Sequence, residues 1–224
     1  LGGDDPSALP RLLGEAFGYS RRHGHWAYGG LYPATLARLC GRALELGVEV
    51  EFARQLIRRR ALQAPPAAVC NPAWPWPLKL FTFGGLRIVR NDHELSFDGK
   101  AQRRPFELLK GLLALGGRQV ADSQLIDWLW PGAEGDAGQR ALITTLQRLR
   151  ELLGVRQAIS HSGGHLSLDM QLCWFDGWAL DASLRDGPLE ASQRLYRGPF
   201  LAGEPDSWLI PVRERYQRRL VEAL

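Results

Sequence analysis

The sequence predicts an α+β fold in which a small antiparallel sheet and three helices are flanked on both sides by helical segments. Three observations lead to this class. Apolar residues recur every three or four positions near both ends of the chain, a pattern typical of amphipathic helices. From Leu78 the period changes to two, as expected for strands with one buried face. A proline-rich stretch separates the first helical part from this alternating region.

The composition favours a soluble cytoplasmic protein without a membrane partner. The chain has 224 residues, of which 45% are hydrophobic, so it can hold two or three small domains. It contains no apolar run of about 18 residues and no secretory signal. Three widely spaced cysteines are too few for a disulfide framework and fit a reducing compartment. Because the chain starts with Leu1 and stops inside a helical pattern, we expect a fragment of a longer protein.

The charge of the chain favours a polyanionic partner. The formal net charge is +4 and the isoelectric point is near 9.2. The excess of basic residues lies before residue 174, and no segment is strongly basic. A nucleic-acid surface must therefore be a local patch.

Residues 1–64 read as the end of a helical repeat or sensor region. Residues 31–47 and 48–62 each carry apolar side chains at helical spacing, with Gly47 as a plausible helix end. Residues 65–77 follow as a linker, since the stretch APPAAVCNPAWPWP holds five prolines in fourteen residues. Proline removes a backbone donor and fixes φ, so neither a helix nor a central strand is expected to run through it.

Residues 78–174 carry an ordered series of short elements. Three alternating runs, LKLFTF, LRIV and ELSF, predict antiparallel strands. Three helical patterns follow, the second of which we expect Asp122 to cap. The run AISHSGGHLSLDM predicts a hairpin with a glycine tip. This order is that of a winged helix-turn-helix, in which the third helix enters a DNA groove and the hairpin is the wing. Residues 175–224 are again helical in pattern.

The third helix, within GDAGQRALITTLQRLRELLG, has an apolar stripe that must face the core and an opposite polar face. Arginine and glutamine can pair bidentately with guanine and adenine, and an isoleucine or threonine methyl can touch a thymine methyl. The alternative is a solvated amphipathic face with ordinary charges, and the surrounding order of elements favours DNA. The predicted reading residues are Arg140, Ile143, Thr144, Gln147, Arg148 and, on a flank, Arg150.

Two further groups are candidates for phosphate contact. Basic residues at the start of the first helix of this region oppose the helix dipole, which favours an external anion there. Polar residues near the hairpin tip suit phosphate or the minor groove. These candidates are Lys100, Gln102, Arg103 and Arg104 at the helix start, and Ser160, His161, Ser162 and His165 in the hairpin. His161 and His165 have no Cys or acidic cluster beside them, so no metal site is expected. The sequence holds none of the common catalytic motifs, so we expect no enzyme and no cofactor.

The segments LKLFTFGGLRIV, GKAQRRPFELLKGLLALGGRQVADSQLIDWLWPG and QRALITTLQRLRELLG resemble the winged-helix domain of OmpR/PhoB-type response regulators. They are more similar to the variant in Streptomyces antibiotic regulatory proteins and large MalT-like regulators. LYRGPFLAGEPDSWLIPVRERYQRRLVEAL resembles the first part of the bacterial transcriptional activator domain, made of tetratricopeptide-like helices, that follows the winged helix in that group.

The resemblance implies a transcriptional activator that binds double-stranded DNA, often as head-to-tail pairs on direct repeats, and recruits RNA polymerase. It also implies a sensor or ATPase region upstream in the same polypeptide. The chain contains no receiver domain with a phosphoacceptor aspartate, so control by phosphorylation is not implied. The alternative function is a protein-interaction module in which the winged helix is a docking surface without DNA binding.

Overall fold

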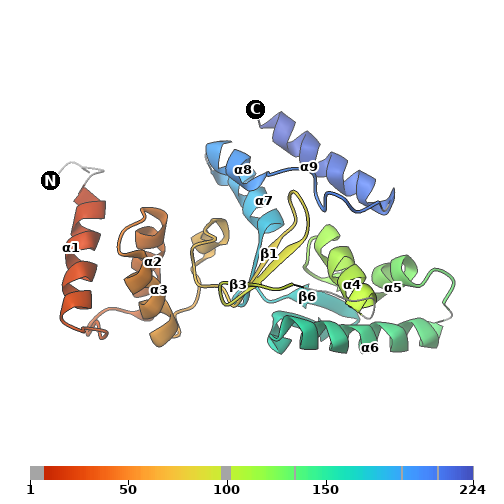
Figure 1. Ribbon diagram of the computed structural model, residues 1–224, viewed down its shortest axis with the longest axis horizontal. Helices are drawn as coiled ribbons and strands as arrows, with labels where there is room; N and C mark the ends of the chain where they lie inside the picture. The colour runs from red at the N-terminus through yellow and green to blue at the C-terminus, as the bar shows by residue number, and fades with distance from the viewer. Residues whose placement is uncertain (1–7, 97–101, 134, 188, 206, 224) are drawn as a thin grey trace. The chain divides into compact units, whose positions relative to one another are not determined.

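The computed structural model describes residues 8–96, 102–133, 135–187, 189–205 and 207–223 (Figure 1). These residues are mostly helical and also form two small sheets, which confirms the α+β class. The chain divides into two compact units, Leu1–Pro75 (unit 1) and Trp76–Leu224 (unit 2). The division between the two units falls inside the predicted linker of residues 65–77. The second predicted boundary, after residue 174, lies within unit 2 and stays a prediction. Within the described ranges, no helix combines the length and apolar content needed to cross a membrane.

Unit 1 contains three helices, α1 Ala8–Arg22, α2 Pro33–Glu45 and α3 Val50–Arg59. The last two lie where helical spacing predicts them, and Gly47 takes a φ of 69° just after α2, as expected of a helix end. Helix α1 is an addition to the predicted helices, and its residues Leu13 and Phe17 are buried at helical spacing. Phe17 packs against Phe52 of α3 with ring centroids 5.6 Å apart, so aromatic packing joins the first helix to the third.

The sequence predicts that no helix runs through the proline-rich stretch, but part of this stretch has regular structure. Pro66–Cys70 forms a single 3₁₀ turn. Proline is tolerated in the first turn of a helix, where its missing N–H has no acceptor to serve. After this turn, the side-chain oxygen of Asn71 accepts a hydrogen bond from the Ala73 backbone N–H at 2.9 Å, which ends the turn locally.

Unit 2 is built on a four-stranded sheet in the order β3-β2-β1-β7. Its strands are β1 Leu78–Phe81, β2 Arg87–Arg90, β3 His93–Glu94 and β7 Cys173–Phe175. The first three pair antiparallel as predicted. Strand β3 shares only Glu94 with the predicted run ELSF, whose Phe97 lies outside the described residues. The fourth strand was not predicted: β7 pairs parallel with β1, with Leu78 opposite Cys173.

Three helices follow the first three strands in the predicted order. They are α4 Arg103–Ala114, α5 Asp122–Leu129 and α6 Gly135–Leu153. Helical spacing predicts that Phe106, Leu109, Leu112 and Leu113 of α4 form its buried stripe. The three leucines are fully buried, whereas Phe106 is half-buried, and Leu108 is also fully buried.

A second sheet of three short strands lies beside α6 (Figure 1). Strand β4 Val120–Ala121 pairs with β6 His165–Leu168, which pairs with β5 Ile159–Ser162. The β5–β6 hairpin turns through Gly163 and Gly164, both with positive φ. This tip is the glycine turn that the sequence predicts.

The last helices of unit 2 are α7 Asp176–Asp186, α8 Leu189–Leu195 and α9 Ile210–Glu222. Phe83, just after β1, packs against Tyr216 of α9 with ring centroids 5.1 Å apart, and Phe200 stacks on the same tyrosine at 5.5 Å. The Arg213 guanidinium donates to the carbonyl oxygens of Phe200, Leu201 and Glu204. In Figure 1, α7, α8 and α9 lie on the side of unit 2 away from α6.

A buried carboxylate joins α7 to the end of β1. Asp176 is 2% exposed and accepts hydrogen bonds from the Thr82 N–H at 2.5 Å, the Thr82 hydroxyl at 2.6 Å and the Phe83 N–H at 3.0 Å. Burial raises the pKa of Asp176 to about 6, and these donated hydrogen bonds oppose that rise. The residue therefore links two segments that are 93 positions apart in the chain.

Candidate nucleic-acid interface

The orientation of α6 is fixed by its apolar stripe. Leu142, Leu146, Leu149 and Leu153 are each at most 2% exposed, and their spacing of four, three and four residues places them on one side of the helix. Gly154 ends the helix with a φ of 67°, and its N–H donates to the Arg150 carbonyl. The side of α6 opposite the leucines must consequently face away from the core.

Five of the six predicted reading residues lie together on this outer side. The exposed set is Arg140, Ile143, Thr144, Gln147 and Arg148. The Thr144 hydroxyl donates back to the Arg140 carbonyl at 2.9 Å, and the Gln147 amide donates to Glu151 at 3.3 Å. Within the described part of the chain, neither Arg140 nor Arg148 forms an ion pair. Two guanidinium groups are thus free to meet an anion.

The sixth residue, Arg150, has a different place. It is half-buried, and its guanidinium donates two hydrogen bonds to the Ile159 carbonyl, at 3.1 Å and 2.7 Å. The bidentate contact holds the C-terminal half of α6 against the first strand of the hairpin. Arg150 therefore positions the two elements, and the other five predicted residues, which share the exposed side of the helix, are called the α6 face.

The hairpin residues divide into outward and inward side chains. Ser160 and Ser162 are exposed on β5, where they pair with Ser167 and His165 of β6. The His165 ring contacts the Gly163 carbonyl at 2.8 Å, so it also steadies the tip. His161 turns toward α5, and its Nε2 lies 2.8 Å from an oxygen of Asp122. The two serines are the exposed hairpin candidates, and the Ser160 hydroxyl donates to the Ser167 carbonyl at 3.2 Å.

Asp122 does not cap α5, which corrects the expectation from its sequence position. The helix has Ala121 at the N-cap position, and no side chain makes a capping hydrogen bond there. The Asp122 carboxylate is buried instead and also accepts a hydrogen bond from the Gln139 amide of α6 at 2.9 Å. The position of Asp122 at the start of a helical pattern predicts the cap. In the structure, side chains from α6 and β5 bind its carboxylate instead. Asp122 thereby ties α5, α6 and β5 together.

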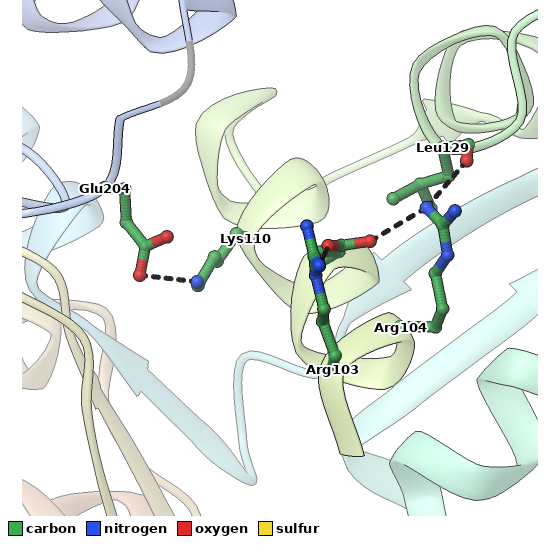
Figure 2. A network of polar contacts seen from close by, with 6 residues as sticks. Arg103, Arg104, Lys110, Leu129 and Glu204 are labelled. Carbon is green, nitrogen blue, oxygen red and sulfur yellow. Dashed lines mark hydrogen bonds and ion pairs between the residues drawn. The ribbon is translucent and has the colours of Figure 1, made fainter. Parts of the chain in front are cut away.

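The basic residues at the start of α4 make contacts within the chain. Lys100 lies outside the described residues, and Gln102 is half-buried. Arg103 and Arg104 are exposed but both bind Glu107, at 2.7 Å and 2.9 Å (Figure 2). Arg104 also donates to the Leu129 carbonyl at 2.9 Å. Glu107, in the next turn of the same helix, thus compensates one of these two positive charges, and the phosphate contact at this helix start stays a prediction.

A groove runs between α6 and the first hairpin strand. It is lined by Ile143, Leu146, Gln147, Arg150, Arg156, Gln157, Ile159, Ser160 and His161. Arg156 was not among the predicted site residues; it is exposed and its guanidinium lies 3.7 Å from the Glu151 carboxylate. Its position two residues after the glycine that ends α6 could have indicated it, because that glycine turns the chain back along the helix. Arg156 adds a third guanidinium beside the α6 face.

The described residues show little that suggests metal or thiol chemistry. They contain no group of three or more His, Cys, Asp and Glu side chains that could hold a metal ion. Cys40 and Cys173 are buried and Cys70 is exposed, all three as free thiols. Burial raises the pKa of the Cys40 thiol to about 12, which keeps it protonated and unreactive at neutral pH.

The chain is similar to a solved protein structure over part of its length. No protein-family model matches the chain, and no curated protein matches it. Among solved structures, the chain is similar to Mycobacterium tuberculosis EmbR, whose structure was determined in complex with a low affinity phosphopeptide. The two are 19% identical with a TM-score of 0.49, and the alignment covers 66% of this chain. It spans 43% of the EmbR chain, less than half of that protein.

Proposed function

We propose that the chain is a sequence-specific, double-stranded DNA-binding transcriptional regulator, and that unit 2 contains a winged helix-turn-helix. In this reading α6 is the recognition helix and the β5–β6 hairpin is the wing. The observation that carries the proposal is the α6 face, on which Arg140 and Arg148 remain unpaired among the described residues beside Ile143, Thr144 and Gln147. These residue types match the hydrogen-bonding and methyl groups of the major groove.

The arrangement of the remaining elements supports the same proposal. Helices α7, α8 and α9 lie on the other side of unit 2 from α6 (Figure 1), and the five residues of the α6 face are exposed. Arg150 and Asp122 hold the hairpin at a fixed place beside α6, as a wing that contacts the same duplex requires. In this proposal Ser160, Ser162 and Arg156 contact phosphates next to the groove that α6 enters.

The sequence resemblance adds the regulatory part of the proposal. We infer an activator in the bacterial cytoplasm that has no catalytic activity of its own. It binds as a head-to-tail pair on direct repeats and recruits RNA polymerase. Tetratricopeptide-like helices follow the winged helix, and an upstream sensor or ATPase region of the same polypeptide controls it.

Salt-dependent binding to a random duplex separates this function from that of a docking module. Several phosphate contacts should give an association constant that falls steeply and linearly on a log–log plot against salt. Replacing Arg140 or Arg156 by alanine should reduce the slope by about 1 each if the residue contacts phosphate. The matched control is Arg185→Ala, an exposed arginine on α7. A chain without measurable DNA affinity at low salt would be a protein-interaction module.

Sequence preference tests the α6 face directly. Duplexes enriched from a random pool give the preferred sequence. The double variant Gln147→Ala/Arg148→Ala should lose about 10- to 100-fold in affinity for that sequence and much less for random DNA, because bidentate base contacts carry discrimination. If the variant keeps the wild-type ratio of the two affinities, α6 does not read the bases.

A further inference from the structure

Ile143 is a large apolar side chain held at the centre of a polar surface. It is 49% exposed, although it belongs to the same helix as four buried leucines. Its neighbours on the outer side of α6 are Thr144 and Gln147, with Arg140 one turn before it. It also lines the groove between α6 and the hairpin, next to the apolar side chains Leu146 and Ile159.

Intrinsic helix propensity does not account for an isoleucine at this position. A β-branched residue loses rotamer freedom in a helix, so alanine, glutamine or arginine would favour the helix more. The core-facing stripe is already complete in Leu142, Leu146, Leu149 and Leu153. Half of the Ile143 surface faces solvent in the free chain. Covering this surface with an apolar group lowers the free energy of the system.

A DNA major groove offers one apolar group at the base edges, the C5 methyl of thymine. The arginines beside Ile143, unpaired among the described residues, make this surface positively charged, so it attracts phosphate groups. This charge favours DNA over an apolar protein partner. We propose that Ile143 contacts the C5 methyl of a thymine and is a specificity-determining residue. This inference rests on the proposed function of α6 and adds a requirement for thymine at one position of the bound sequence.

The experiment removes the methyl group from the DNA and the side chain from the protein. The full chain selects duplexes from a random pool, and each thymine of the enriched duplex is replaced in turn by deoxyuridine. Deoxyuridine keeps the base pair and the O4 acceptor and lacks only the methyl. Wild-type affinity should fall about four-fold at one of these positions, as expected for one exposed methyl group. Ile143→Ala should bind the thymine and deoxyuridine duplexes equally well.

Ile210→Ala is the matched control, because Ile210 is 51% exposed on α9, away from α6. It should keep the wild-type response to deoxyuridine. The proposal is overturned if every deoxyuridine duplex binds the wild type as tightly as the thymine duplex. It is also overturned if Ile143→Ala still shows the loss. A pool that yields no enriched duplex overturns the DNA-binding function as well, whereas enrichment with full tolerance of deoxyuridine overturns only the role of Ile143.

Discussion

The side chain of Asp176 carries a large share of the connection between β1 and the C-terminal helices. Its carboxylate accepts three hydrogen bonds from Thr82 and Phe83 at a site that is 2% exposed. Asp176→Ala leaves those buried donors without a partner and should lower the free energy of unfolding by about 3 kcal/mol. Urea denaturation measures this loss. Asp186→Ala, on an exposed acid of the same helix, should stay within about 0.5 kcal/mol of wild type.

The raised pKa of Asp176 predicts that the free energy of unfolding depends on pH. Burial raises its pKa to about 6 from an ordinary 3.8, so the folded chain binds a proton at pH values where the unfolded chain has lost it. Stability from this group therefore increases as the pH falls from about 6 toward 4, and is lost as the pH rises through 6. Moving from about pH 7.5 to about pH 5 should stabilise wild type by about 1 kcal/mol relative to Asp176→Asn, which cannot titrate.

Asparagine is the informative comparison because its carbonyl oxygen can accept the two backbone N–H groups that bind one carboxylate oxygen. Asp176→Asn should consequently be more stable than Asp176→Ala at neutral pH. Equal pH profiles for wild type and Asp176→Asn would show that Asp176 stays ionised over this range.

Among the helices of unit 2, α6 carries both a packed and an exposed arginine near its C-terminal end. Arg150 binds the Ile159 carbonyl twice, whereas Arg148 is exposed and unpaired among the described residues. Arg150→Ala should cost about 1.5–3 kcal/mol, since the lost hydrogen bonds come from a charged donor. Arg148→Ala should change stability by less than about 0.5 kcal/mol. Thermal unfolding of the two variants compares them, and a similar loss in both would remove the distinction.

The same elements show what local sequence can predict. The leucine spacing of α6 determines its buried side, so the exposure of Ile143, Thr144 and Gln147 followed from the sequence. The roles of Arg150 and Asp122 did not follow. Arg150 binds a carbonyl nine residues away, and Asp122 binds side chains from two other elements. Such partners depend on tertiary packing, which spacing along the chain does not encode.

At the scale of the molecule, α9 belongs to the core of unit 2. Tyr216 is 2% exposed against Phe83 and Phe200. Tyr216→Ala should destabilise unit 2 by about 3–5 kcal/mol, as truncation of a buried aromatic side chain does elsewhere. Hydrogen exchange should accelerate at the β1 amides, because that strand ends beside the aromatic cluster. Val221→Ala on the same helix, at a residue 61% exposed, should leave this exchange unchanged.

The long-range pairing and packing within unit 2 were the least predictable part of the fold. Alternation and turn residues predicted the hairpins, because both partners of each pair lie close in sequence. The pairing of β7 with β1 joins residues almost a hundred positions apart, and the short run Cys173–Phe175 carries no alternation to indicate it. The packing of α9 on the sheet likewise depends on single aromatic side chains rather than on a pattern.

The parallel pairing of β1 with β7 has a consequence for synthesis of the chain. Leu78 leaves the ribosome long before its partner Cys173, so one edge of β1 stays open while α4, α5 and α6 are being made. An unpaired, largely apolar strand edge is a template for pairing with another chain. Nascent chains that pause between residues 90 and 172 should therefore be the species most prone to aggregate, and slow translation through this region should lower the yield of folded protein.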